Sequence, residues 1–379
     1  MRKIFIASPY FSPQDRERIH RGVDAILDGA LSMGPNVKAF EEEFAKMMGV
    51  KHAIAVNSCT SALEISLLAL GMTVGSEVIV PVETFIATGM AIHLTGGVPI
   101  FADIEESTFC LDLEDVKRRI NPKTKGIIIV HMGGLITPKI YELKKFCEEN
   151  KLFLIEDAAH SPGARFNGQY AGSIGDVGCF SFYPSKVMTS GEGGMLTTNS
   201  DQVAAFARNM QHRGRDMTDE DEIYILPGRN VRMSELNALI GRVQLSHLEE
   251  FLTTRRKIAE IYRDELQNDM RGQLIVASQH ENSSYWKVPF ILPSAKICEA
   301  VTAFMHANGV MVDSAYRPPL HLQPVFKRLY GIKEGHLPRS ENLIARHICL
   351  PCHPQMSQED AKHVTSTLKE ALSSCEGKE

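Results

Sequence analysis

The sequence predicts an α/β protein with a large, mostly parallel sheet, followed by a smaller α+β domain. Short apolar runs alternate with helical patterns between about residues 50 and 198, an order typical of βαβ units. The runs are continuously apolar, "EVIVP" and "GIIIV" being examples, as in strands covered by helices on both faces. After residue 198 the alternation stops and a long helical stretch follows.

Seven strands are expected in the first part of the chain. They cover residues 52–56, 77–81, 98–103, 126–131, 151–157, 178–182 and 194–198. Helical patterns lie between them at residues 61–71, 91–95, 113–120 and 141–150. The first of these helices is expected to end at Gly71, because glycine suits the left-handed conformation at a helix C-terminus.

The second part of the chain predicts a different arrangement. Residues 234–266 are helical without proline, and they are expected to form one long helix, or two in succession, as a connector. Later segments at residues 285–292, 300–310, 347–352 and 359–372 mix strand and helix patterns. A length of 379 residues suits two domains, so we predict a large domain over residues 1–250 and a small α+β domain over residues 251–379.

Composition and charge point away from several function classes. The net charge is -5 and no face-sized basic cluster exists, so nucleic acid is not an expected partner. No apolar run reaches about 18 residues, and the N-terminal apolar segment is too short for a signal peptide, so no membrane contact is expected. The eight cysteines then indicate reduced thiols in a cytoplasm. We interpret the single C-x-x-C, Cys349 and Cys352, as structural, and expect no metal.

Polar side chains follow several of the predicted strands. Residues 57–61 follow the first strand, His131 the fourth, Asp157 and His160 the fifth, and Lys186 the sixth. In open α/β sheets ligands bind outside the carboxyl ends of the strands. Hydroxyl, imidazole, carboxylate and amine groups are therefore expected to converge on one edge of the sheet.

Each of these groups also has an ordinary interpretation. Residues 58–61, "SCTS", are compatible with a helix N-terminus that binds phosphate, but in isolation they favour an ordinary helix cap. Asp157 can cap a helix or hold a cationic ring nitrogen. Lys186 can be a surface lysine or form a Schiff base with an aldehyde. Pyridoxal phosphate (PLP) needs an amine, a partner for its ring nitrogen and phosphate donors, and the three features together favour that cofactor.

Long stretches of the chain resemble the DegT/DnrJ/EryC family of sugar aminotransferases, which are PLP enzymes of fold type I. The matching stretches include "GPNVKAFEEEFAKMMGVKHAIAVNSCTSALEISLLALG", "VPVETFIATGMAIHLTGGVPIFADIE", "IEDAAHSPGARFNGQYAGSIGDVGCFSFYPSK", "GEGGMLTTN" and "GRNVRMSELNALIGRVQLSHLEEF". They stand in family order and cover nearly the whole chain. The resemblance implies an aspartate-aminotransferase-like large domain with a smaller C-terminal domain.

The resemblance also implies roles for the residues at matching positions. Lys186 is expected to form the Schiff base and to move the protons, and Asp157 to pair with the ring nitrogen. His160 is expected near the ring hydroxyl, and Phe85 to stack on the ring. Asn230 resembles a residue that reaches the cofactor phosphate of a neighbouring subunit. The phosphate itself is expected to contact Thr60, Ser61 and Ser181.

The implied reaction is transfer of an amino group from an amino acid, glutamate in this family, to a nucleotide-linked keto sugar. The product would feed polysaccharide, glycan or antibiotic sugar synthesis, and the enzyme is expected to be a homodimer with shared active sites. Two alternatives stay open. Some relatives dehydrate a deoxysugar, but they replace the lysine with histidine, and Lys186 counts against this. A non-enzymatic PLP-binding regulator is the other.

Several positions depart from the commoner family pattern or have no assigned role. Tyr183 stands where histidine is frequent in the lysine loop, and Cys59 where glycine is usual. The segment "MGGL", which follows His131, is a further change, and so is Arg229 in the segment "GRN". Both changes bear on the substrate pocket. We expect Trp286 to lie in the core, and His321 and His353 to lie in polar surface loops. Glu192 receives no predicted role.

Overall fold

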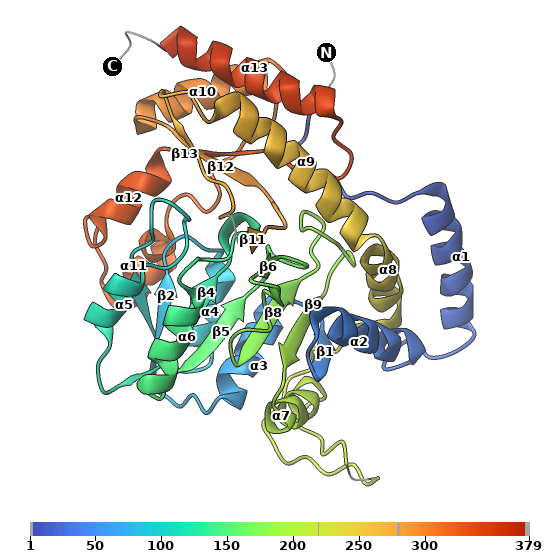
Figure 1. The fold of residues 1–379 in the computed structure, drawn as a ribbon. Helices are drawn as coiled ribbons and strands as arrows, with labels where there is room; N and C mark the ends of the chain where they lie inside the picture. The colour runs from blue at the N-terminus through green and yellow to red at the C-terminus, as the bar shows by residue number, and fades with distance from the viewer. Residues whose placement is uncertain (1–2, 219, 279–280, 376–379) are drawn as a thin grey trace.

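The computed structural model of the chain describes residues 3–218, 220–278 and 281–375 (Figure 1). Its centre is a seven-stranded sheet, which contains all seven strands expected from the sequence. In spatial order these are β1 (His52–Val56), β9 (Gly194–Thr198), β8 (Val177–Ser181), β5 (Phe153–Asp157), β4 (Thr124–Val130), β2 (Glu77–Pro81) and β3 (Val98–Ala102).

Strand direction in this sheet is mostly parallel, as predicted. The neighbours from β3 to β8 run parallel, whereas β9 is antiparallel to both β8 and β1. The segment between β8 and β9 contains no helix, so the chain turns back on the same edge of the sheet and reverses β9. The carboxyl ends of β1, β8, β5, β4 and β2 therefore share one edge with the start of β9.

Helices join the strands where the sequence predicted them, with longer bounds in some cases. They are α3 (Cys59–Ala69), α4 (Ile86–Leu94), α5 (Leu113–Arg119) and α6 (Ile140–Glu149), followed after β9 by α7 (Asp201–Gln211). The segment after α3 turns at Gly71, whose φ of 81° lies in the left-handed region. A short 3-10 turn, η1 (Met132–Gly134), follows β4.

The long helical stretch forms two helices in succession, the second of the two predicted forms. They are α8 (Glu235–Ser246) and α9 (Leu248–Leu266), and they share His247 as a boundary residue. The ring of His247 contacts Asp15 of α1 (Pro13–Leu27) at 2.8 Å. Helix α2 (Pro35–Met48) packs on α8, where the ring of Phe40 lies against Gly241. A Cβ atom added to this glycine would lie only 2.7 Å from the ring.

The C-terminal part builds a second layer above the sheet, at the top of Figure 1. Its three-stranded sheet has the order β10 (Gln273–Leu274), β12 (Val288–Ile291), β13 (His347–Leu350). Its remaining elements are α10 (Ala295–Ala307), η2 (Leu320–Leu322), α11 (Pro324–Tyr330), α12 (Pro338–Ala345) and α13 (Gln358–Cys375). A third small sheet joins β11 (Glu281–Asn282) to β6 (Arg165–Phe166) and β7 (Gln169–Tyr170).

The predicted boundary at residue 250 lies inside α9, so α9 itself connects the two parts of the chain. The division into domains at 1–250 and 251–379 stays a prediction. Helix α9 packs against α13, and α10 also contacts α13. Within the described ranges, no helix combines the length and apolar character needed to cross a membrane.

The cysteines of the C-x-x-C lie in the core, as their structural interpretation required. Cys349 is in β13, Cys352 follows it, and both are fully buried. Burial raises the pKa of the Cys352 thiol to about 12. In the part of the chain that the structure describes, no group of three or more His, Cys, Asp or Glu side chains could hold a metal ion.

Candidate active site

A pocket of about 520 Å³ opens at the carboxyl edge of the central sheet. Its lining brings together six of the eight site residues expected from the sequence. These six are Thr60, Phe85, Asp157, His160, Ser181 and Lys186. They come from four segments, which end or follow the strands β1, β2, β5 and β8. Parallel strand direction therefore gathers them, as the sequence predicted.

Asp157 is the last residue of β5 and is almost completely buried. One carboxylate oxygen accepts a hydrogen bond from the Thr88 hydroxyl at 2.8 Å, and the other accepts from the Ala159 amide at 3.2 Å. Burial raises the pKa of Asp157, while the bond from Thr88 and the nearby Lys186 charge lower it. A buried carboxylate with few compensating partners suits a cationic ring nitrogen as its partner.

Lys186 lies in the loop between β8 and β9 and is partly buried. Its amide donates to the Tyr183 carbonyl, and its Nζ lies 4.4 Å from the centroid of the Trp286 ring. Burial is the main reason that the pKa of Lys186 falls to about 8, although Asp157 raises it. At pH 7 about a tenth of this amine is consequently neutral and nucleophilic.

The N-terminus of α3 faces the same pocket. Ser58 caps the helix by accepting from the Ser61 amide at 3.2 Å, and Thr60 lines the pocket. Ser61 is not among the lining residues, and its hydroxyl donates to the Asn57 side chain at 2.7 Å. Gly194 lets β9 pass closely, since a Cβ there would lie 2.4 Å from the carbonyl carbon of Ser58. This terminus can receive a phosphate.

Three aromatic rings pack together in the lining of the pocket. His160 stacks on Trp286 with ring centroids 3.8 Å apart, and its Nε2 lies 2.6 Å from the Tyr316 hydroxyl. Burial lowers the pKa of His160 well below its ordinary value, so the ring is neutral. Phe85, whose side chain is 55% exposed, lies at the rim with its ring 6.0 Å from that of Tyr316.

Some lining residues had no predicted role. Trp286 was expected in the core, and it is buried, but it also lines the pocket together with Lys287 and Tyr316. Thr88, which holds Asp157, was also missed. A hydroxyl one helical turn from Phe85 was the available signal for Thr88. For the C-terminal residues the signal was weaker, because they are far from the other site residues in sequence.

The structure does not bring Asn230 into this pocket. Asn230 is exposed and pairs through its backbone with His212, and the neighbouring Arg229 forms an ion pair with Glu64 at 3.1 Å. Its expected contact is with a neighbouring subunit, so its role stays a prediction. Glu192 and Tyr183 both line the pocket and are exposed, Tyr183 to 50%.

The expectation of polar surface loops for His321 and His353 was wrong. Both side chains are buried, and His321 contacts Glu341 through its Nε2 at 3.0 Å. His321 also lies near the ring of Phe101, with centroids 6.1 Å apart. His321 lies in η2, and His353 follows β13. Neither histidine lines the pocket that contains Lys186.

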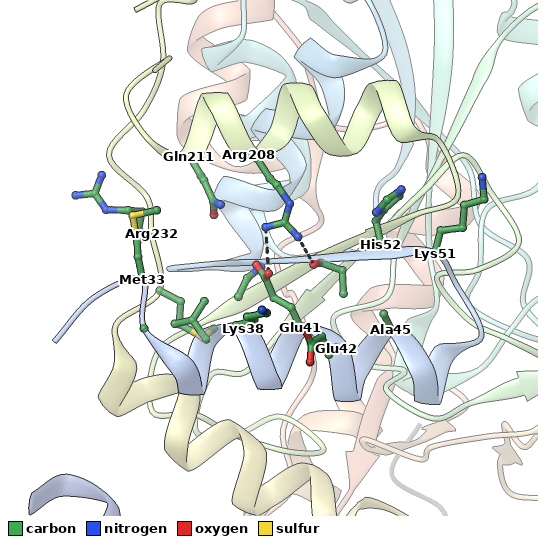
Figure 2. Close-up of a pocket in the computed structure, with 15 residues that line it drawn as sticks. Met33, Lys38, Glu41, Glu42, Ala45, Lys51, His52, Arg208, Gln211 and Arg232 are labelled. Atoms are coloured by element: carbon green, nitrogen blue, oxygen red, sulfur yellow. Dashed lines mark hydrogen bonds and ion pairs between the residues drawn. The ribbon is translucent and has the colours of Figure 1, made fainter. Parts of the chain in front are cut away.

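A second pocket, of about 370 Å³, lies along β1, a strand at one lateral edge of the central sheet (Figure 2). Figure 2 shows Arg208 of α7 reaching toward Glu41 of α2, and the two form an ion pair at 3.0 Å. Glu41 also accepts from the Ala55 amide at 2.8 Å, and Arg208 donates to the Ala53 carbonyl at 3.5 Å. The pair therefore caps the free edge of β1, and we assign no catalysis to this pocket.

Fold and active-site pocket together define a protein of the aspartate-aminotransferase-like fold, type I. The chain belongs to the DegT/DnrJ/EryC1/StrS aminotransferase family, whose model matches residues 13–369. Both the predicted fold class and the family resemblance are thereby confirmed.

Several similar proteins have names or solved structures. A GDP-perosamine synthase of Vibrio cholerae is 36% identical over 89% of this chain and 91% of its own length. A UDP-N-acetyl-3-dehydro-alpha-D-glucosamine 3-aminotransferase of Acidithiobacillus ferrooxidans is 33% identical over 96% of both chains. The aminotransferase TlmJ from Streptoalloteichus hindustanus superposes with a TM-score of 0.90 at 28% identity, covering 98% of this chain and 99% of its own.

Proposed function

We propose that this protein is a PLP-dependent aminotransferase that transfers an amino group from an amino acid to a nucleotide-linked keto sugar. Membership of the aminotransferase family and the names of its relatives support the reaction class. The observation that carries the proposal is the joint presence of Lys186 and Asp157 in one pocket, with the start of α3 in the same lining. Glutamate is the donor that we propose.

The residues present fit PLP. The pocket contains an amine whose pKa is about 8, a buried carboxylate and a helix N-terminus, which suit the aldehyde, the ring nitrogen and the phosphate. Lys186 and Asp157 would hold the first two. We propose that Thr60 and Ser181 contact the phosphate, that Phe85 covers the ring and that His160 lies near its hydroxyl. Ser61 would need to release Asn57 to join them.

Bound PLP supplies an aldehyde for the amine and a ring that withdraws electrons from the carbon that loses a proton. Lys186 can take and return that proton at Nζ, because its pKa of about 8 lies near neutral pH. Asp157 keeps the ring nitrogen protonated through its negative charge, and Thr88 holds the carboxylate in place at 2.8 Å. Trp286 and Tyr316 exclude water from one side of the pocket.

Other parts of the proposal go beyond a single chain. We propose a homodimer in which Asn230 reaches the phosphate site of the neighbouring subunit, which its exposure permits. The eight cysteines are all unbridged, which supports a reducing compartment, and we propose the cytoplasm. The sugar, its nucleotide and the carbon that receives the amine stay open.

Two relatives carry regulatory names, a pleiotropic regulatory protein of Geobacillus stearothermophilus and a sensory transduction protein of Saccharopolyspora erythraea. A regulator that binds PLP without converting it is therefore the second candidate function.

The proposal is tested by adding glutamate to the purified, PLP-loaded protein. We expect the visible absorbance of the bound cofactor to disappear, with release of one 2-oxoglutarate for each Lys186. A regulator that only binds PLP would leave the absorbance unchanged. A protein that acquires no visible absorbance with PLP would contradict the role of Lys186.

A further inference from the structure

Lys287 is a second lysine in the active-site pocket, and the function proposed above gives it no role. It precedes β12 in the C-terminal part of the chain. Its Nζ lies 4.3 Å from the centroid of the Trp286 ring, and the Nζ of Lys186 lies 4.4 Å from the same centroid. Because one indole ring contacts both amines, a substrate group that reacts beside Lys186 lies within reach of Lys287.

The hydrogen bonds of Lys287 leave room for a ligand. Its Nζ donates to Asp313 at 2.5 Å, and its side chain is 8% exposed. An ammonium group has three N–H donors, so two are available beyond the bond to Asp313. Asp313 is itself 41% exposed, so water screens its negative charge. Lys287 can therefore bind an anionic group without leaving its present partner.

A second carboxyl group lies close to this lysine but does not compete with a ligand. Glu83 is fully buried, its two oxygens accept no hydrogen bond within the described residues, and the Nε2 of His347 lies 3.6 Å from one of them. Burial raises the pKa of Glu83 well above its ordinary value, although the charge of Lys287 lowers it. Asp313, which is hydrogen-bonded to Lys287, is thus the carboxylate that faces this lysine.

The charges that line the pocket narrow the choice of ligand. The charged lining residues, in the described part of the chain, are Asp157, Lys186, Glu192 and Lys287. Lys186 serves the reaction and the N-terminus of α3 suits the phosphate, so Lys287 is the cation left for a further anion. In an amino-acid donor, the α-carboxylate is bonded to the same carbon as the amine that reacts beside Lys186.

We propose that Lys287 binds the α-carboxylate of the amino-acid donor. This inference rests on the proposed aminotransferase function. It assigns Lys287 to donor recognition and leaves the keto sugar to the other residues of the pocket. An acidic substituent on the sugar would offer the same chemistry, so the test has to separate the two sources of carboxylate.

The test compares two ligands that differ only in the α-carboxylate, 2-methyl-L-glutamate and 4-aminopentanoate. 2-Methyl-L-glutamate has no α-proton to lose, but 4-aminopentanoate keeps one on the carbon that bears the amine. Binding of both ligands to the PLP-loaded protein is therefore measured from the rapid absorbance change on mixing, before any turnover. In the wild type we expect 2-methyl-L-glutamate to bind more tightly. Lys287→Met should weaken 2-methyl-L-glutamate roughly 10- to 100-fold, the value of a charge-assisted hydrogen bond, and leave 4-aminopentanoate within about twofold.

Two further variants guard against a folding defect. Lys287→Arg keeps a cation and should retain the preference for 2-methyl-L-glutamate. The double variant Lys287→Met with Asp313→Asn removes both partners of the ion pair, and it should lose the preference while keeping the wild-type PLP absorbance. Retention of the full preference in Lys287→Met would overturn the inference.

The remaining outcomes separate this inference from the proposed function. If Lys287→Met weakens binding of an acidic nucleotide sugar and not of 2-methyl-L-glutamate, the donor assignment is wrong. If the wild type converts glutamate and all variants keep the preference, the proposed function stands and only the inference fails. If the wild type acquires no PLP absorbance, both fail.

Discussion

The burial that makes the Lys186 amine reactive also lowers the free energy of unfolding, because the folded chain has to bury a charge. Burial and the charge of Lys287 together lower the pKa of its amine from 10.5 to about 8, although Asp157 raises it. Below pH 8 both the folded and the unfolded chain hold the proton, and the folded chain bears the cost of a buried charge. Above pH 10.5 neither state holds it, so this cost disappears.

Replacement of this lysine should therefore stabilise the cofactor-free protein. We expect Lys186→Met to raise the free energy of unfolding at pH 7 by on the order of 2 kcal/mol. The gain should shrink as the pH rises from 8 to 10.5, which urea denaturation at several pH values would measure. Lys327→Met, at an exposed position in α11, is the matched control and should change little. A gain that does not vary with pH would assign the effect to packing.

The start of β9 and the start of α3 depend on each other through one glycine. A Cβ at Gly194 would lie 2.4 Å from the carbonyl carbon and 2.6 Å from the amide nitrogen of its two α3 neighbours, Ser58 and Cys59. Both neighbours are backbone atoms, so the helix terminus has to move to make room. The close approach of these backbone atoms explains why the last residue of the "GEGG" segment is a glycine.

Gly194→Ala should accordingly weaken the phosphate site. We expect the dissociation constant of PLP, measured by equilibrium dialysis, to rise roughly tenfold or more as the amides of α3 shift. Overpacking of this kind also costs about 1–3 kcal/mol of stability. Gly29→Ala is a control, because the Ala25 carbonyl at 3.2 Å is the nearest atom there. Unchanged PLP binding in Gly194→Ala would show that α3 does not hold the phosphate.

The free edge of β1 is closed by side chains rather than by another strand. Glu41 accepts from the Ala55 amide and pairs with Arg208, which donates to the Ala53 carbonyl (Figure 2). Unpaired strand edges promote association between molecules, and charged side chains prevent it. The pair thus supplies the hydrogen-bond acceptor and donor that the backbone of a neighbouring strand would otherwise offer to β1.

Loss of this cap should expose the edge. Glu41→Ala should lower the free energy of unfolding by about 1–3 kcal/mol and increase aggregation, because the Ala55 amide loses its acceptor. Glu41→Gln keeps an acceptor oxygen at the same place and should be much milder. Denaturation and light scattering at increasing protein concentration would measure both effects. Equal behaviour of the two variants would mean that the charge, rather than the hydrogen bond to β1, matters.

Sharing of active sites between two subunits would be a property of the assembled molecule. If Asn230 completes the neighbouring phosphate site, Lys186→Met and Asn230→Ala inactivate different halves of each site. Mixed dimers of the two inactive variants then contain one intact site. After subunit exchange, an equal mixture should recover roughly one quarter of wild-type activity, as random pairing predicts. No recovery in dimers shown to be mixed would place Asn230 in the site of its own chain.

The active site also depends on the packing of distant segments. The sheet contributes Asp157 and Ser181, whereas Trp286, Lys287 and Tyr316 come from the C-terminal part that lies above its carboxyl edge. Tyr316 is held there by its contact with His160 at 2.6 Å, and the indole N–H of Trp286 donates to the Ser185 carbonyl at 2.6 Å. The C-terminal part is therefore one wall of the pocket.

Strands, most helices and the principal site positions could be predicted because their signals are local. A continuous apolar run followed by a polar residue, as at Asp157, requires only neighbouring positions and the rule that parallel strands end at one edge. The lysine loop and the start of α3 were predictable for the same reason. The family resemblance then assigned their roles, which the experiments above test.

Features that depend on contacts between distant segments could not be predicted in this way. The reversal of β9 and the burial of His321 follow from how the chain turns and packs. The same holds for Lys287, which local sequence leaves as an ordinary charged residue before a strand. Its place beside Lys186 arises because two segments about 100 residues apart meet at Trp286, and such meetings depend on long-range packing rather than on local propensity.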